Sequence, residues 1–235
     1  MRKNNKMRMM ILMVVLTGML ILTGCNKYTN MENDMKNVEE RDYATILLIM
    51  EGENEKSCHF ILGIAQEKKV GEKSMTEEVS EWECNDLKEL AKAYSSVKGK
   101  DLSLAHLKVI LFSIDEKTKK AAKANNETEK ENMQSLLGML DENEEIAKTC
   151  PALQLSESEA FLAYMKQEDK PVGSYFENLI REMGRQGQKV TWLKDYLKAM
   201  REQMPMERFV LRRVNEGWTI DKEEGQCYIN SSTGQ

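Results

Sequence analysis

Common catalytic and metal-binding motifs are missing from this chain of 235 residues. It contains only two histidines, His59 and His106, and neither a Cys-x-x-Cys nor a His-Glu-x-x-His segment, so the usual zinc-ligand spacings do not occur. A Gly-x-Ser-x-Gly nucleophile motif is missing too, and His106 has no nucleophile or carboxylate partner at a motif spacing. The sequence therefore predicts a protein that is not an enzyme and that holds no metal and no cofactor.

An excess of positive charge is missing as well. The chain carries 34 Lys and Arg against 39 Asp and Glu, and setting aside the four cations among the first eight residues leaves 30 against 39. Because a nucleic-acid site needs a basic face to neutralise phosphates, nucleic acid is not expected as a partner. An acidic domain also gains nothing from anionic lipid, so membrane attachment would require an anchor.

The N-terminus offers such an anchor. A basic head leads into the apolar run Met9–Leu22, whose 14 residues are fewer than the roughly 20 that a membrane-spanning helix requires. The run ends at Leu22, Thr23, Gly24 and Cys25, which resemble the lipobox of bacterial lipoproteins. The resemblance implies cleavage before Cys25 and a diacylglyceryl group with palmitate-type chains on its thiol, a stable two-chain anchor. The alternatives are an ordinary secretory signal with an incidental cysteine and an uncleaved helix.

Composition divides the chain into four parts. Residues 1–24 are the predicted signal peptide, and residues 25–41, polar and without periodicity, are interpreted as a flexible tether. Residues 42–230 contain the strand-like and helical patterns and are predicted to form one domain, followed by a disordered tail at 231–235. We therefore expect a single folded domain that stands off the membrane surface.

Four cysteines remain besides Cys25, namely Cys58, Cys84, Cys150 and Cys227. An even number in an exported protein allows two disulfides with three pairings, and no spacing favours any one of them. They can equally be buried free thiols, which behave as small apolar side chains. We favour the free-thiol interpretation.

Apolar runs predict the strands. Tyr43–Met50 and Ser57–Ala65 flank a polar turn and are expected to pair as an antiparallel hairpin. His106–Ile114 is a further apolar strand, preceded by the connector Lys100–Ala105. Shorter strands are expected at Ala152–Leu155, Glu207–Val214 and Cys227–Ile229.

Apolar residues at helical spacing predict the helices. Asp86–Lys98 has Asn85 as its expected N-cap and Gly99 just past its end. The charged stretch Glu116–Asn132 is interpreted as a solvated helix or loop. Further helices are expected at Met133–Leu140, Gly173–Arg185 and Thr191–Arg201.

One more helix, Glu157–Met165, is expected to begin with a capping box made by Ser156 and Glu159. Helices interspersed with strands indicate a layered domain, and a hairpin cannot be parallel. The sequence therefore predicts an α/β (α+β) fold in which a mixed β-sheet packs against helices.

Several segments in order resemble a known family. The stretch Leu102–Ile110, LSLAHLKVI, resembles the pattern L-S-x-x-H-x-K-V-I of the Ger(x)C (GerAC) lipoproteins, the C subunits of spore nutrient-germinant receptors. A leucine-rich helix followed by Asn143–Ile146, NEEI, resembles the family's R-x-x-E-I segment, and Pro151–Leu153 its next strand. The lipobox and the acidic segment that precedes the first strand also resemble the family. The chain departs from the family in having Asn26-Lys27 after the cysteine, and it resembles the N-terminal domain only.

The resemblance implies a function and several features. It implies a third strand near Met75–Trp82, and it makes His106 and Lys108 structural signature residues rather than catalytic ones. The protein would be a non-enzymatic lipoprotein subunit acting in spore germination, on the outer face of the spore inner membrane, with A-type and B-type membrane subunits as partners. The alternative is a surface lipoprotein that binds a small solute or peptide for a transporter, although the chain is short for a two-lobed binding protein.

Overall fold

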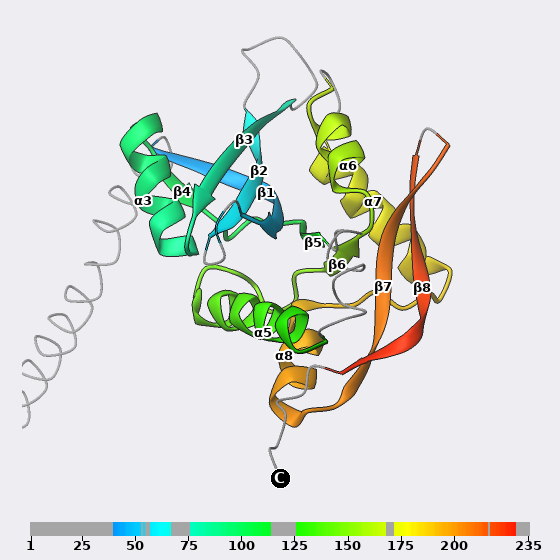
Figure 1. Ribbon diagram of the computed structural model, residues 1–235. Helices are drawn as coiled ribbons and strands as arrows, with labels where there is room; N and C mark the ends of the chain where they lie inside the picture. The colour runs from blue at the N-terminus through cyan, green and yellow to red at the C-terminus, as the bar shows by residue number, and fades with distance from the viewer. Residues whose placement is uncertain are drawn as a thin grey trace, which may run out of the picture. The chain divides into compact units, whose positions relative to one another are not determined.

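The structure is a computed structural model that describes residues 40–52, 54, 57–66, 76–113, 126–167, 172–215 and 217–228. Eight strands form one mixed sheet with the order β3-β2-β1-β5-β6-β7-β8, and β4 pairs with β1 (Figure 1). The strands are β1 Arg41–Glu51, β2 Cys58–Gln66, β3 Thr76–Cys84, β4 Asp101–Ser103, β5 Val109–Ser113, β6 Ala152–Leu155, β7 Pro205–Val214 and β8 Gly217–Tyr228. The described helices are α3 Leu87–Lys98, α5 Asn126–Glu142, α6 Ser158–Met165, α7 Val172–Arg185 and α8 Leu193–Glu202.

Strand directions make the sheet mixed, as the sequence predicts. β1 and β2 form the expected antiparallel hairpin, with Leu47 opposite Leu62, and β3 adds to β2 antiparallel at the edge. β1, β5, β6 and β7 run parallel to one another, and β8 returns antiparallel to β7. Parallel neighbours need long crossover connections, and the chain supplies helices in them. The predicted α/β class with a mixed sheet is confirmed.

Helices cover both faces of the sheet and divide the core in two. One apolar cluster joins the sheet to α3, α5 and α8, with Tyr94, Leu137 and Tyr196 as buried members. The second cluster joins the sheet to α6 and α7, with Phe161 and Phe176 at its centre. Because central strands are buried on both faces, they are continuous apolar runs in the sequence rather than alternating ones.

A half-buried carboxylate holds the start of α7 against the sheet. Both oxygens of Glu77, on β3, accept the Gly173 N–H at 2.9 Å, and Thr45 Oγ1 donates to Glu77 Oε1 at 2.8 Å. A Cβ atom at position 173 would lie 2.6 Å from Glu77 Oε1 and 2.9 Å from Thr45 Cβ, so this close approach requires glycine. Burial raises the pKa of Glu77 despite the hydrogen bonds that its carboxylate accepts.

Glu77→Gln should flatten the pH dependence of stability. Because the folded-state pKa lies above the ordinary 4.5, the stability contributed by neutral Glu77 is present below that value and is lost as the pH rises through the folded-state pKa. Between about pH 5 and pH 8 the native protein should therefore lose more unfolding free energy than Glu77→Gln. Urea unfolding across this range measures the difference. Glu144→Gln, at an exposed position, is the control, and parallel curves for Glu77→Gln and the native protein would contradict the prediction.

Helix α3 begins one residue later than predicted. Asp86, not Asn85, is its N-cap, because the Asp86 carboxylate accepts the Glu89 N–H at 2.7 Å. Asn85 instead donates its backbone and side-chain N–H groups to the Glu89 carboxylate at 2.8 Å. Gly99 ends the helix in the left-handed conformation, with φ 68°, as predicted.

The predicted capping box of α6 is wrong. The Ser156 hydroxyl donates to the Leu211 carbonyl on β7 at 3.2 Å, and its N–H bonds the same oxygen at 3.3 Å. Ser156 therefore extends the pairing of β6 with β7 and is not free to cap a helix. The residue that stands at the N-cap, Glu157, makes no side-chain cap bond.

Several predicted boundaries shift. The strand predicted at His106–Ile114 is β5 and begins only at Val109, and the predicted connector before it contains β4. The strand Met75–Trp82 that the resemblance implies is present as the longer β3, although Met75 lies outside the described residues. The terminal strand predicted at Cys227–Ile229 is part of β8, which begins ten residues earlier, at Gly217. The described part of Glu116–Leu140 is helical, as α5.

Candidate functional site

The signature segment Leu102–Ile110 passes along β4, a short connection and the start of β5. Most of its apolar members are core residues, since Leu102 is 8% exposed and Val109 and Ile110 are fully buried. Its polar members lie in the connection and at the strand ends, where each meets a different part of the fold. The segment therefore ties the sheet to its surroundings.

Ser103 and Leu104 meet Glu145, from the second segment that carries the resemblance. Glu145 Oε2 accepts the Leu104 N–H at 2.8 Å and lies 3.3 Å from the Ser103 hydroxyl. The carboxylate thus satisfies backbone and side-chain donors just past the end of β4. Two segments that are some forty residues apart in the sequence are joined by one side chain.

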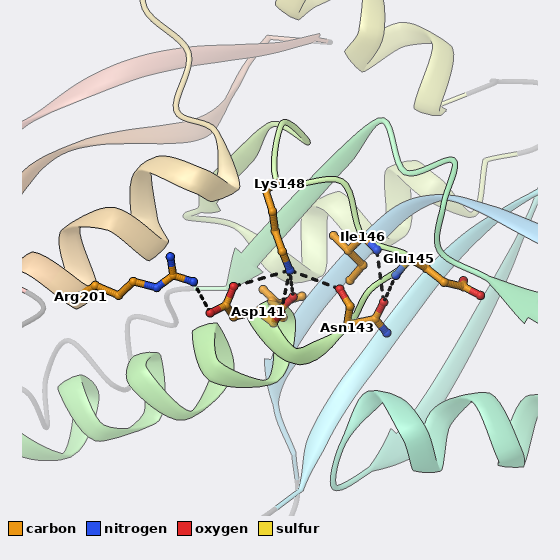
Figure 2. A network of polar contacts seen from close by, with 7 residues as sticks. Asp141, Asn143, Glu145, Ile146, Lys148 and Arg201 are labelled. Carbon is orange, nitrogen blue, oxygen red and sulfur yellow. Dashed lines mark hydrogen bonds and ion pairs between the residues drawn. The ribbon is translucent and has the colours of Figure 1, made fainter.

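The turn that carries Glu145 is itself fixed by a side chain. Asn143 Oδ1 accepts the N–H groups of Glu145 and Ile146, at 3.0 and 3.2 Å (Figure 2). An asparagine that bonds the backbone two and three residues ahead stabilises a turn. Ile146 is 2% exposed and belongs to the core cluster under α3, α5 and α8. One polar anchor and one apolar anchor therefore hold the turn.

His106 and Lys108 occupy separate surroundings. His106 is exposed and its ring stands edge-on to Tyr43, with ring centroids 4.8 Å apart. The Lys108 N–H donates to the Thr45 carbonyl on β1 at 2.7 Å, and Lys108 Nζ lies 3.1 Å from Glu177 Oε2 on α7. The Lys108 ammonium, with a smaller effect of Arg181, lowers the pKa of the Glu177 carboxyl. His106 therefore contacts β1, whereas Lys108 contacts both β1 and α7. The two side chains do not form one site.

Lys148 closes the C-terminal end of α5. Its Nζ donates to the carbonyls of Leu140, Asp141 and Asn143 at 2.9, 2.9 and 3.3 Å. Figure 2 shows the side chain directed at the helix end, with Arg201 approaching Asp141 from α8. The last carbonyls of a helix lack intrahelical partners and carry partial negative charge, which a lysine neutralises. This network was not predicted, because nothing in the sequence pairs Lys148 with carbonyls up to eight residues earlier.

A shallow hollow lies beside this network. Its volume is about 230 Å³, and it is lined by Asp141, Lys148, Lys194, Leu197, Lys198, Arg201 and Glu202. Pockets for small molecules usually measure about 300–1,000 Å³, so this hollow is smaller than most of them. Lys148 and Arg201 are already engaged with α5, as described above. The hollow gives no support to the alternative of a solute-binding lipoprotein.

Lys148→Met should destabilise the protein by about 1–2 kcal/mol, because it leaves three carbonyls at the end of α5 without their charged donor. The estimate is at the low end for charged hydrogen bonds, since 37% of the Lys148 side chain is exposed and water can replace part of the loss. Urea unfolding measures the change. Lys194→Met, at the rim of the same hollow, is the matched control and should stay within about 0.5 kcal/mol of the native protein. Equal losses in both variants would contradict the capping role.

The described cysteines are free thiols in this structure. Cys84 and Cys150 are buried and Cys58 is half-buried, and burial raises the pKa of Cys150 to about 12. Nothing is described of the Cys227 side chain. In the described ranges, no group of three His, Cys, Asp or Glu side chains is placed to hold a metal ion. Over the same residues, no helix has the length and apolar character needed to cross a membrane.

The predicted lipidation site, with Leu22, Thr23, Gly24 and Cys25, lies outside the described residues, as do the signal peptide, nearly all of the tether and the tail at 231–235. Comparison with family models, curated proteins and solved structures finds no match to the chain.

Proposed function

We propose that the protein is a membrane-tethered, non-enzymatic subunit of a spore nutrient-germinant receptor. Lipid on Cys25 would hold it at the outer face of the spore inner membrane, where it acts as an adaptor beside A-type and B-type membrane subunits. The observation that carries the proposal is the Glu145 contact. It joins the two sequence segments on which the resemblance to the receptor C subunits rests.

This contact supports the proposal because polar groups of the two segments are hydrogen-bond partners of each other. Ser103 is 3% exposed, and a buried hydroxyl and N–H require an acceptor. Glu145 supplies that acceptor from a turn held by Asn143. The polar residues of the two resembling segments therefore depend on each other in this fold. This is expected if both segments come from one family pattern.

The tether and the charge fit an adaptor. The 16 residues between Cys25 and Asp42 could reach about 50 Å when extended, which is enough to place the domain against the external parts of a membrane partner. Anchoring confines the domain near its partners and raises its effective concentration there without any new contact. The excess of Asp and Glu over Lys and Arg disfavours adsorption of the domain to anionic lipid.

Spores in which the gene is deleted test the proposal. They should lose little optical density when nutrients are added, and an introduced copy of the full chain should restore the response. Viable counts after enzymatic opening of the spore coat and cortex provide the control, because they show that the unresponsive spores are alive.

Co-purification tests the partnership directly. The tagged full chain, solubilised from spore membranes, should retain two polytopic membrane proteins encoded beside it. A tagged, unrelated lipoprotein with the same lipobox is the control for capture through lipid alone. Normal nutrient germination of the deletion strain together with capture of no polytopic protein would overturn the proposal.

A further inference from the structure

Two of the free thiols face each other across the edge of the sheet. Cys58 is the first residue of β2 and Cys84 is the last residue of β3, and their Cα atoms are directly opposed in the antiparallel ladder. Side chains of directly opposed residues project from the same face of a sheet. The pair lies at the end of the β2–β3 ladder remote from the connection between the two strands.

Both thiols project into the same core. Cys84 is 5% exposed and belongs to the cluster under α3, and Cys58 packs against that cluster while remaining half-buried. Phe60, two residues along β2, lies on the same face. By the exposure of the whole residue, Cys58 is therefore the more accessible member of the pair and Cys84 the more sheltered one.

We propose that Cys58 and Cys84 form a cross-strand disulfide by exchange with a disulfide oxidant, which makes the edge of the sheet a redox modification site. Directly opposed residues have Cα atoms about 4.5–5.5 Å apart, within the range of about 4.4–6.8 Å found across disulfides. Opposed Cβ atoms are about 4.5–5.5 Å apart, so the strand ends need to approach by roughly 1 Å for bonding. The strand ends are the easiest place for that movement.

The exchange proceeds in two steps. The Cys58 thiolate attacks a glutathione disulfide and expels one glutathione thiolate, forming a mixed disulfide. The Cys84 thiolate then attacks Cys58 Sγ and expels the second glutathione. Two protein thiols are oxidised, one glutathione disulfide is reduced to two glutathione molecules, and these retain the two protons that the protein loses.

The protein environment makes this exchange slow at neutral pH. Burial, reinforced by the negative charges of Glu83 and Glu51, raises the pKa of Cys58. Burial also raises the pKa of Cys84, with further contributions from Glu89, Asp86 and Glu83. Only the thiolate attacks a disulfide. Oxidation should therefore be slow at neutral pH and faster under alkaline conditions.

The bond would fix the outermost strand. β3 lies at the end of the strand order and carries Glu77, which holds the start of α7. A disulfide between residues 58 and 84 would close the open end of the β2–β3 pair. The supply of oxidant in the cell rests on the proposed export of the protein, since oxidising surroundings are found outside the cytoplasm. The chemistry itself does not depend on any receptor role.

Oxidation of the purified full chain tests the pair. The reduced chain is incubated with glutathione disulfide at about pH 9, where thiolates are more abundant, and is then alkylated and digested with trypsin without reduction. Each chain should lose two free thiols, and one new species should join the peptides 57–68 and 74–88, which contain Cys58 and Cys84. Peptides 149–166 and 223–235, which contain Cys150 and Cys227, should remain alkylated.

Single substitutions separate the two steps. Cys84→Ser should stop at a glutathione adduct on Cys58, because the second thiol is missing, and Cys58→Ser should leave the buried Cys84 unmodified. A native chain that stops at the adduct, or that links either cysteine to another peptide, would overturn the proposal. The disulfide is measured on the isolated protein, so its absence would not change the interpretation of the germination experiments. Conversely, normal germination of the deletion strain would not change the interpretation of the disulfide experiment.

Discussion

Cys25→Ala should abolish incorporation of fatty acid into the protein and remove its lipid anchor. Each methylene group of the two acyl chains contributes about 0.8 kcal/mol to membrane binding when it is buried in the bilayer, whereas a single acyl chain holds a protein only reversibly. Growth with a clickable palmitate analogue should label the native chain and leave Cys25→Ala without signal. The domain should remain folded, because the cysteine lies outside the part of the chain that forms the sheet.

The control for this prediction has to account for the uncleaved signal. Without Cys25 the lipoprotein peptidase has no substrate, and the retained apolar run Met9–Leu22 could itself keep the chain at the membrane. A second form, in which an ordinary cleavable secretory signal replaces residues 1–25, removes the run as well. This soluble form should leave the membrane pellet almost completely and fail to restore germination. Palmitate labelling of Cys25→Ala, or full germination with the soluble form, would contradict the tethered adaptor.

Part of the fold follows directly from the sequence. β1 and β2 are continuous apolar runs around a polar turn, so both their burial and their pairing were predictable. The helices α7 and α8 have apolar residues at helical spacing and were predicted to within about two residues at each end. These elements share one property, which is that the local pattern and the final environment agree.

Strands β4 and β8 were missed or predicted only in part, because the local sequence pattern does not specify them. β8 has the sequence GWTIDKEEGQCY, in which charge hides any alternation. It is a strand because it pairs with β7 along nearly its whole length, with Leu211 opposite Ile220. β4 has only three residues and exists because β1 offers it a partner. Pairing partners that are distant in the sequence decided both cases.

The candidate site was predictable only in part. The sequence singled out His106 and Lys108, yet the residues that organise the region are Glu145 and Lys148. Their roles come from contacts with the end of β4 and with the end of α5. The sequence of a charged stretch does not show which carboxylate or ammonium has a structural role. That role depends on the donors or acceptors that the fold places beside it. Position within the resembling segment was the only signal for Glu145.

Phe161→Ala should be among the most destabilising single substitutions, with a loss of about 3–5 kcal/mol in unfolding free energy. Phe161 is fully buried in the cluster between the sheet and helices α6 and α7. Its ring lies 5.1 Å from that of Trp218 on β8 and 5.5 Å from that of Phe176 on α7, measured between centroids. Removing it leaves a cavity and ends aromatic contacts that add to area burial.

Urea unfolding of the soluble form, followed by tryptophan fluorescence, measures this loss. Phe161→Leu removes less volume and should cost about 1–2 kcal/mol, and Val97→Ala, at a position 70% exposed, should change stability by less than about 0.5 kcal/mol. Because Trp218 contacts Phe161, its emission should also shift in folded Phe161→Ala. A loss of less than about 1 kcal/mol would contradict the prediction, because it would mean that the Phe161 ring adds little to a cluster that already contains Leu211 and Trp218 of the β7–β8 hairpin. A loss of about 3–5 kcal/mol would show that the Phe161 ring is a main contributor to the packing between this hairpin and helices α6 and α7.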